Sequence, residues 1–271
     1  MLNWQVGAVK ITCVVEMVIP FPEGSLVRDA TAEALKTSPW LFPHFAKEDG
    51  TLIASVQALL VEAPGLRLVV DTCIGNDKPR NLTGGNPLAT PFLQHLADAG
   101  WSRDSVDAVI CTHLHADHVG WNTMLVDGKW VPTFPKARYL IGKREFEYWR
   151  SHEGDEEQQA IMGDSVRPIF DAGLVDLVEV DHRISPEVRL RPTPGHTPGH
   201  VSVMIQSEGQ SAVITGDMPI IPAKWRIPNG RHAMTATFEA RRPPARSCSP
   251  NGPTSRSWSS ALTMPRRQPD A

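Results

Sequence analysis

The sequence predicts an α+β fold in which two β-sheets pack together and helices lie outside them. Strand-like runs outnumber helical runs, and they form one group before residue 113 and a second group after residue 173. Two helical runs separate these groups. Because an apolar sheet face has to be buried against another layer, this order of elements indicates layered packing. The pattern covers residues 1–218, and no amphipathic period continues beyond them.

The first group of strands consists of runs rich in β-branched and other apolar residues. These runs span Val6–Val15, Ile53–Glu62 and Leu66–Asp71. Ala63-Pro-Gly65 separates the last two runs and predicts a hairpin turn. Residues 20–50 are rich in proline and have no clear period. We therefore expect them to form a long loop or flap near the functional site.

The remaining elements follow in chain order. Pro87–Ala99 predicts a helix that Gly100 ends, and Asp107–Thr112 predicts a short buried strand that leads into a cluster of histidines. Further helices are expected over Lys143–Arg150 and Glu156–Ala172, and further strands over Leu174–Val180, Val188–Arg191, Val201–Gln206 and Ala212–Thr215.

The composition is that of a soluble globular protein, with 41% hydrophobic and 21% charged residues. No stretch approaches about 18 uninterrupted apolar residues, and the N-terminus lacks the pattern of a signal peptide. We therefore expect a cytoplasmic protein without a membrane partner. The four cysteines are scattered, and Cys13, Cys73 and Cys111 sit in apolar runs, which indicates buried thiols and no disulfide framework or cysteine metal site.

The charge balance changes after Met218. Residues 1–218 hold 18 Lys and Arg against 28 Asp and Glu, a balance of −10. Residues 219–271 hold 9 against 2, a balance of +7, together with 9 of the 24 prolines. Such a shift marks a boundary. The acidic body would repel a polyanion, so we expect no nucleic-acid partner.

Three short motifs concentrate side chains that bind metals: HLHADH at residues 113–118, PGHTPGH at 194–200 and TGD at 215–217. Each follows or ends a predicted strand. Side chains alternate along an extended segment, so His113 and His115 should point the same way while Asp117 and His118 come round to the other side. One loop can therefore serve two adjacent metal ions, and a carboxylate such as Asp217 suits a bridge between them.

In this order and at these separations, the three motifs resemble the successive ligand motifs of the metallo-β-lactamase superfamily. The similarity covers roughly residues 5–218, and the segments HLHADHVGWN and DTCIGNDKPR look closest to the lactonase-like branch. The resemblance implies a four-layered αββα sandwich with the metals at one edge between the sheets. It also implies a metal-dependent hydrolase that uses a metal-bound hydroxide to cleave a small ester or lactone, with no partner beyond that substrate and an oligomeric state that the sequence leaves open.

The resemblance implies two divalent ions, which we expect to be zinc, although manganese or iron would accept the same donors. The expected ligands are His113, His115 and His196 for the first ion, Asp117 and His118 for the second, and Asp217 as the bridge. Asp117 is also the predicted catalytic residue. Asp71 matches the family's carboxylate that orients a ligand imidazole. His200 is expected to support the ligands, because His196 already fills the binding position.

Several alternatives remain open. A β-lactamase, a thioesterase of the glyoxalase II type and a phosphoesterase would use a similar site. A metal-binding remnant without activity is a further alternative, because the family supplies one more histidine to the second ion, well downstream of the bridging aspartate. Here His232 is the only histidine after Asp217, fifteen residues on, and it lies in an Arg/Pro/Gly context.

A shifted reading frame would explain the missing ligand. If most third codon bases are G or C, the shift turns residues 219–222 into His-His-Pro and residues 263–270 into His-Ala-Ala-Pro-Ala-Ala-Gly, and both resemble family sequences. We therefore predict that residues 219–271 are an irregular, basic, Pro/Arg-rich tail read out of frame, which leaves the sandwich incomplete at its C-terminal end. The alternative, a genuine tail that binds nucleic acid, lacks interleaved aromatic residues. The nucleotide sequence of codons 215–271 tests this prediction.

Overall fold

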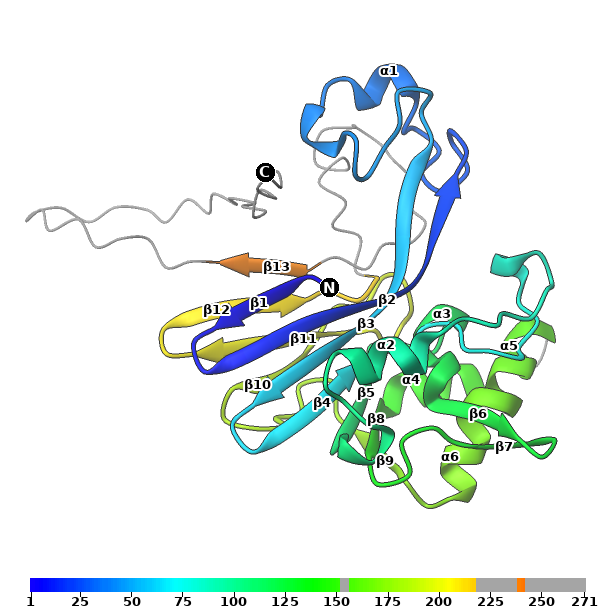
Figure 1. Cartoon of the computed structure of the whole chain (residues 1–271), viewed down its shortest axis with the longest axis vertical. Helices are drawn as coiled ribbons and strands as arrows, with labels where there is room; N and C mark the ends of the chain where they lie inside the picture. Colours follow the sequence, from blue (N-terminus) through cyan, green and yellow to red (C-terminus); the bar gives the residue numbers. More distant parts are fainter. Residues whose placement is uncertain (152–155, 218–237, 242–271) are drawn as a thin grey trace, which may run out of the picture.

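The computed structural model describes residues 1–151, 156–217 and 238–241. Two sheets and a separate hairpin account for its strands (Figure 1). The larger sheet has the order β1-β2-β3-β4-β5-β8-β9, from Asn3–Val6, Val9–Phe21, Leu52–Ala63, Leu66–Val70, Ala108–Cys111, Arg138–Gly142 and Val175–Val178. The smaller sheet has the order β10-β11-β12-β13, from Val188–Pro192, Val201–Ser207, Gln210–Ile214 and Phe238–Arg241. The hairpin pairs β6 (Thr123–Val126) with β7 (Lys129–Pro132).

Strands β4, β5, β8 and β9 of the larger sheet run in the same direction, and β5 and most of β8 are buried on both faces. In β5, Ala108 and Ile110 belong to the core shared with the smaller sheet, whereas Val109 and Cys111 belong to the core shared with the helices. Strands with two buried faces need a continuous apolar run instead of an alternating one. This explains the sequence Ala-Val-Ile-Cys directly before the histidine cluster.

The helices gather on the side of the larger sheet that faces away from the smaller sheet (Figure 1). They are α2 (Phe92–Asp98), α3 (Ala116–Val119), α4 (Lys143–Arg150), α5 (Glu156–Ile161) and α6 (Arg167–Asp171), with a π-helical segment at Met162–Val166 between the last two. The described part of the chain has no helix after α6. It therefore contains three of the four expected layers: helices, larger sheet and smaller sheet.

Most predicted elements are present, with several differences at their ends. The predicted strand Val6–Val15 is interrupted by a turn at Gly7, whose φ is 57°, and its second part continues as β2 to Phe21. The helix predicted from Pro87 begins only at Phe92, because residues 87 and 88 form isolated β-bridges with residues 79 and 76. Strands β6, β7 and β8 were not predicted. They are only four or five residues long, too short for a period to stand out.

Strands β2 and β3 extend beyond the sheet as a two-stranded ribbon (Figure 1). The segment between them, residues 22–51, carries the short helices α1 (Ala32–Leu35) and η1 (Pro39–Leu41). It has a small core of its own that includes Leu26, Leu35 and Leu41. The expected loop is therefore partly helical.

The predicted C-terminal tail is described only at residues 238–241, which form β13 and pair antiparallel with β12. The expectation of an irregular chain does not hold for these four residues. Residues 218–237 and 242–271, including His232 and Cys248, lie outside the described residues, so the reading-frame hypothesis stays a prediction. Cys13, Cys73 and Cys111 are free and buried, as expected. Among the described helices, none has the length and apolar character needed to cross a bilayer.

Candidate metal centre

Four segments bring the predicted residues to one edge of the two sheets. Asp71 follows β4, and the HLHADH motif follows β5. Because β4 and β5 are parallel, their carboxyl ends meet at the same edge. His196 lies in the loop between β10 and β11, and Asp217 follows β12 in the smaller sheet. The backbone N–H of Val201 donates to the carbonyl of Thr112 at 3.0 Å and joins the two sheets at this edge.

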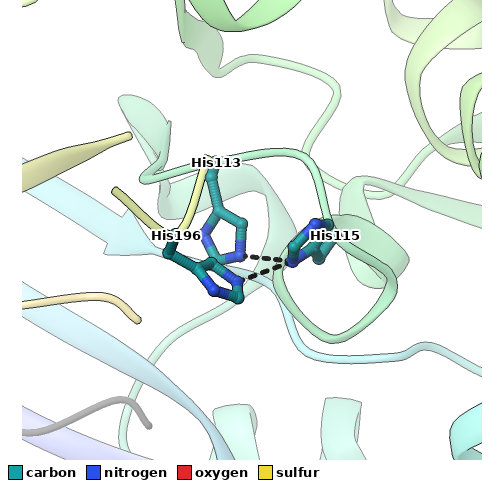
Figure 2. Close-up of side chains that lie close together, drawn as sticks. All are labelled: His113, His115 and His196. Atoms are coloured by element: carbon teal, nitrogen blue, oxygen red, sulfur yellow. Dashed lines mark hydrogen bonds between the residues drawn. The ribbon is translucent and has the colours of Figure 1, made fainter. Parts of the chain in front are cut away.

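Three imidazoles form the first cluster (Figure 2). Nδ1 of His115 lies 3.0 Å from Nε2 of His113 and 2.8 Å from Nε2 of His196. In a tetrahedral zinc site with Zn–N distances of about 2.0–2.1 Å, two ligand nitrogens are about 3.3 Å apart. Burial lowers the pKa of His113 and of His196, which favours the neutral imidazoles that bind metal ions. Together with Nδ1 of His115, their ring nitrogens form a donor set for a cation.

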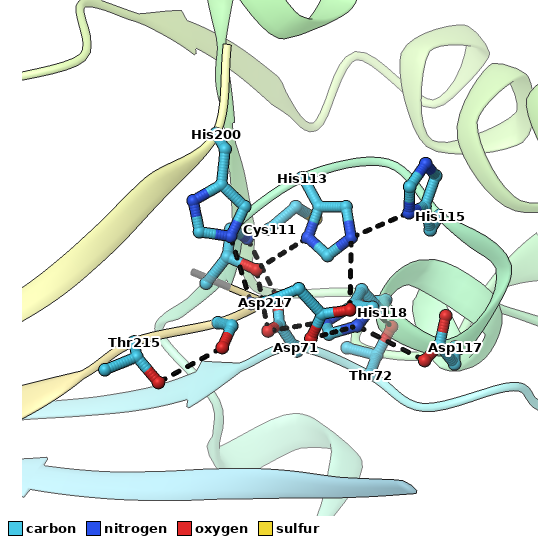
Figure 3. A network of polar contacts seen from close by, with 12 residues as sticks. Asp71, Thr72, Cys111, His113, His115, Asp117, His118, His200, Thr215 and Asp217 are labelled. Carbon is cyan, nitrogen blue, oxygen red and sulfur yellow. Dashed lines mark hydrogen bonds and ion pairs between the residues drawn. The ribbon is translucent and has the colours of Figure 1, made fainter. Parts of the chain in front are cut away.

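The second cluster lies around His118 (Figure 3). Its Nε2 is 3.3 Å from Oδ1 of Asp217 and 3.4 Å from Oδ2 of Asp117. Burial alone would lower the pKa of His118, but the charges of Asp217, Asp117 and Asp71 outweigh it and raise this pKa well above the ordinary value. The same concentration of negative charge would attract a divalent cation.

Asp217 lies between the two clusters. Its Oδ1 faces His118, and its Oδ2 is 3.5 Å from Nε2 of His196 and 4.0 Å from Nε2 of His113. This Oδ2 is buried and has no hydrogen-bond partner among the described residues. A buried carboxylate oxygen without a partner is costly, and a cation on each side would satisfy it. The chemistry of these donors therefore fits a pair of divalent ions.

Two further residues hold the clusters in place. Asp71 accepts hydrogen bonds from the backbone N–H and the hydroxyl of Thr112, both at 2.8 Å, and its Oδ2 lies 2.8 Å from Nδ1 of His118. Nε2 of His118 consequently points toward Asp117 and Asp217. Nε2 of His200 accepts the backbone N–H of Asp217 at 3.0 Å, so its lone pair is already used. These positions suit the supporting roles that the sequence predicts for Asp71 and His200.

The C-terminal end of α3 is hydrogen-bonded directly to the loop after β4. The backbone N–H of Thr72 donates to the carbonyl of His118, and that of Gly120 donates to the carbonyl of Cys73, both at 2.7 Å. A Cβ at Gly120 would lie 1.7 Å from the carbonyl oxygen of Ile74, which is inside van der Waals contact. Only glycine permits this approach.

Substituting Gly120 by Ala should therefore destabilise the protein by about 3 kcal/mol or more, because rigid backbone atoms have to move apart. Urea unfolding of the metal-free protein measures this change. Gly163→Ala is the matched control, since a Cβ there meets nothing within 4 Å. Equal stabilities of the two variants would contradict the close approach.

Two buried glutamates near the site were not predicted. Glu16 sits at a β-bulge in β2, where its carboxylate accepts the backbone N–H of Ile74 at 2.8 Å and the indole N–H of Trp121 at 2.6 Å. Glu145 in α4 contacts both histidine loops. The sequence did contain a signal for Glu16, because Glu16 is a charged residue inside the apolar run that forms β2. Nothing local distinguishes Glu145 from the other acidic residues of its helix.

A small pocket, partly open to solvent, adjoins the second cluster. Its polar end consists of Asp117, His118 and Asp217. The rest of its wall is mainly apolar and comes from the ribbon, residues 22–51 and the 3-10 helix η2 (Asn81–Thr83): Ile19, Phe21, Leu26, Ala54, Val56 and Leu82, with Ser55 and Gln57. Leu26 thus brings the 20–50 segment to the site, as the sequence predicts.

The mixed α+β fold and its cluster of histidines and aspartates define the class of the protein. The chain matches the metallo-beta-lactamase superfamily over residues 54–269 and belongs to it. The predicted family and fold class are confirmed. The matched range includes most of residues 219–271. The hypothesis that these residues are read out of frame stays a prediction, which the nucleotide sequence would test.

N-acyl homoserine lactonases occur among both the sequence relatives and the structural neighbours. AiiA from Bacillus thuringiensis subsp. kurstaki is 27% identical over 119 residues, which are 44% of this chain and 40% of that protein. The match thus spans about two fifths of the relative. Among solved structures, hydrolase AbOPH has a TM-score of 0.62 at 25% identity, covering 79% of this chain and 72% of that one. The dizinc quorum-quenching lactonase AidC has a TM-score of 0.58 at 20% identity, covering 78% and 71%.

Proposed function

We propose that this chain is a metal-dependent hydrolase that opens a lactone or cleaves a small ester with an apolar acyl chain. The observation that carries the proposal is the buried Oδ2 of Asp217, which has no hydrogen-bond partner among the described residues and lies between the two clusters. Those clusters adjoin a pocket with a mainly apolar wall. The lactonases among the relatives support the same substrate class.

Each residue of the site has a proposed role. The first ion would be held by His113, His115 and His196, the second by Asp117 and His118, and Asp217 would lie between them. When bound, two divalent ions, zinc or else manganese or iron, supply Lewis acidity that polarises a carbonyl oxygen and lowers the pKa of a water. Asp71 keeps Nε2 of His118 directed at the site, and His200 holds the backbone of Asp217.

Asp117 is the residue that we propose as catalytic. Its carboxylate lines the pocket, while its Oδ2 also faces His118. A carboxylate at this position can accept a proton from an attacking water and return it to the leaving alkoxide. The apolar wall would hold the acyl chain and exclude water from the ester or lactone group. A polyanionic substrate does not suit a body whose charge balance is −10.

A panel of lactones and aryl esters tests this function. We expect turnover that a chelator abolishes and that zinc, manganese or cobalt restores, because the ligands cannot activate water without a cation. Metal analysis of the active protein should give two equivalents. Turnover that resists chelation would exclude the proposed chemistry, whereas one equivalent or none without turnover would identify a remnant that has lost activity.

A further inference from the structure

The two loops that carry the three-histidine cluster meet at one buried carboxylate. Glu145 lies in the first turn of α4, and only 1% of its surface is exposed. Its Oε1 accepts the backbone N–H of Leu114 at 3.2 Å, and its Oε2 accepts the hydroxyl of Thr197 at 2.7 Å and the backbone N–H of Gly199 at 3.0 Å. One side chain thus contacts both the HLHADH loop and the PGHTPGH loop.

On the first loop, the contact is to the residue between the two histidines. The N–H of Leu114 donates to Glu145, and the carbonyl of Leu114 accepts the side-chain N–H of Gln158 at 3.0 Å. Leu114 is therefore held through both of its backbone polar groups. Because His113 and His115 flank this residue, the directions of both imidazoles depend on it.

On the second loop, Thr197 directly follows His196. This loop packs so closely on the start of α4 that a Cβ at Gly199 would lie 2.2 Å from the backbone nitrogen of Glu145. Hydroxyl and N–H donors to a buried carboxylate form charge-assisted hydrogen bonds, which are about twice as strong as neutral ones. His196 is thereby fixed to the same helix as the first loop.

A third contact reaches His115 through an aromatic ring. The indole N–H of Trp149, one turn along α4, donates to Oε1 of Glu145 at 2.7 Å. The Trp149 ring lies 5.4 Å from the His115 ring, at an interplanar angle of 63°. Glu145 therefore orients the side chain that packs against the more exposed imidazole of the first loop.

We propose that Glu145 is a positioning residue that sets the separation between the His113/His115 pair and His196, and so determines the affinity of the first metal site. The proposal rests on the metal-binding part of the proposed function. His115 and His196 are 81 residues apart in sequence, yet their ring nitrogens are 2.8 Å apart. Small changes in loop position would alter this geometry, and residues that orient metal ligands typically contribute about 10–100-fold to metal affinity.

Glu145→Gln is the most informative substitution, because it keeps the shape of the side chain. Each carboxylate oxygen accepts two hydrogen bonds, so whichever way the amide is turned, its NH₂ group faces two donors. One of the two loops therefore loses its acceptor. Glu147→Gln is the matched control, since Glu147 is an exposed acidic residue on the same helix.

Cobalt titration of the metal-free full chain tests the proposal, with His115→Ala used to assign the step that belongs to the three-histidine site. We expect Glu145→Gln to bind cobalt at this site about 10–100-fold more weakly than wild type, with an altered visible spectrum. Glu147→Gln should match wild type in both. A folded Glu145→Gln protein with wild-type affinity and spectrum would overturn the proposal.

Thr197→Val provides a second test in case Glu145→Gln does not fold. It removes one hydroxyl donor and should weaken cobalt binding in the same direction by a smaller factor, about 10-fold or less. Unchanged cobalt affinity in this variant would count against the proposal. If the wild-type chain bound no cobalt, the proposed function itself would be overturned. If the wild-type chain bound cobalt and Glu145→Gln bound it equally well, only the proposal for Glu145 would be overturned.

Discussion

The His115→Ala variant should contain one equivalent of metal fewer than wild type and lose at least about 10³-fold in kcat/KM, equivalent to about 4 kcal/mol of transition-state stabilisation. His115 is central to the first cluster, because its Nδ1 approaches the ring nitrogens of both His113 and His196. Without it, three protein ligands become two, too few for a stable zinc site. Metal analysis after dialysis and steady-state kinetics measure the two effects.

His95→Ala is the control for this substitution. His95 lies in the last turn of α2 and is partly exposed. Its loss should leave metal content and kcat/KM close to wild type. Full metal content in His115→Ala would show that the three imidazoles do not form the first site.

The Asp217→Asn variant should separate the stability of the metal-free protein from the stabilisation that metal provides. The metal-free protein should already be destabilised, because the neutral amide no longer pairs with His118, whose Nε2 lies 3.3 Å from Oδ1 of Asp217. Metal at 100 times its Kd stabilises a folded protein by about 2.7 kcal/mol per site. The variant should lose most of this gain, because an amide oxygen is a neutral ligand and cannot replace the bridging carboxylate.

Urea unfolding with a chelator and with added zinc measures both quantities. Asp171→Asn, at an exposed position at the end of α6, serves as the control and should keep the full metal-dependent gain. If metal stabilised Asp217→Asn as much as it stabilises wild type, Asp217 would not be a ligand of the proposed site. The measurement with chelator gives the contribution of the Asp217–His118 pair, so the metal-dependent gain is assessed separately from it.

Much of the candidate site could be predicted because its residues are close together in sequence. The HLHADH motif places His113 and His115 two residues apart after a buried strand, and the structure brings their ring nitrogens to 3.0 Å. Asp117 and His118 lie in α3, where the ring centroid of His118 is 4.1 Å from that of His113. Strand β5 was recognisable by its short apolar run, since both of its faces are buried. Local spacing and polarity carry this information without knowledge of the fold.

Other features depended on packing between distant segments. Strand β8 takes its place in the larger sheet by pairing with β5 and β9, and Glu145 acquires its role through residues 31 and 52 positions away. The sequence by itself determined the family, the fold class and the candidate ligands, because these follow from local motifs and apolar patterns. Only the tertiary structure decided that Glu145 contacts both histidine loops, because hydrogen bonds between loops depend on positions that no local pattern specifies.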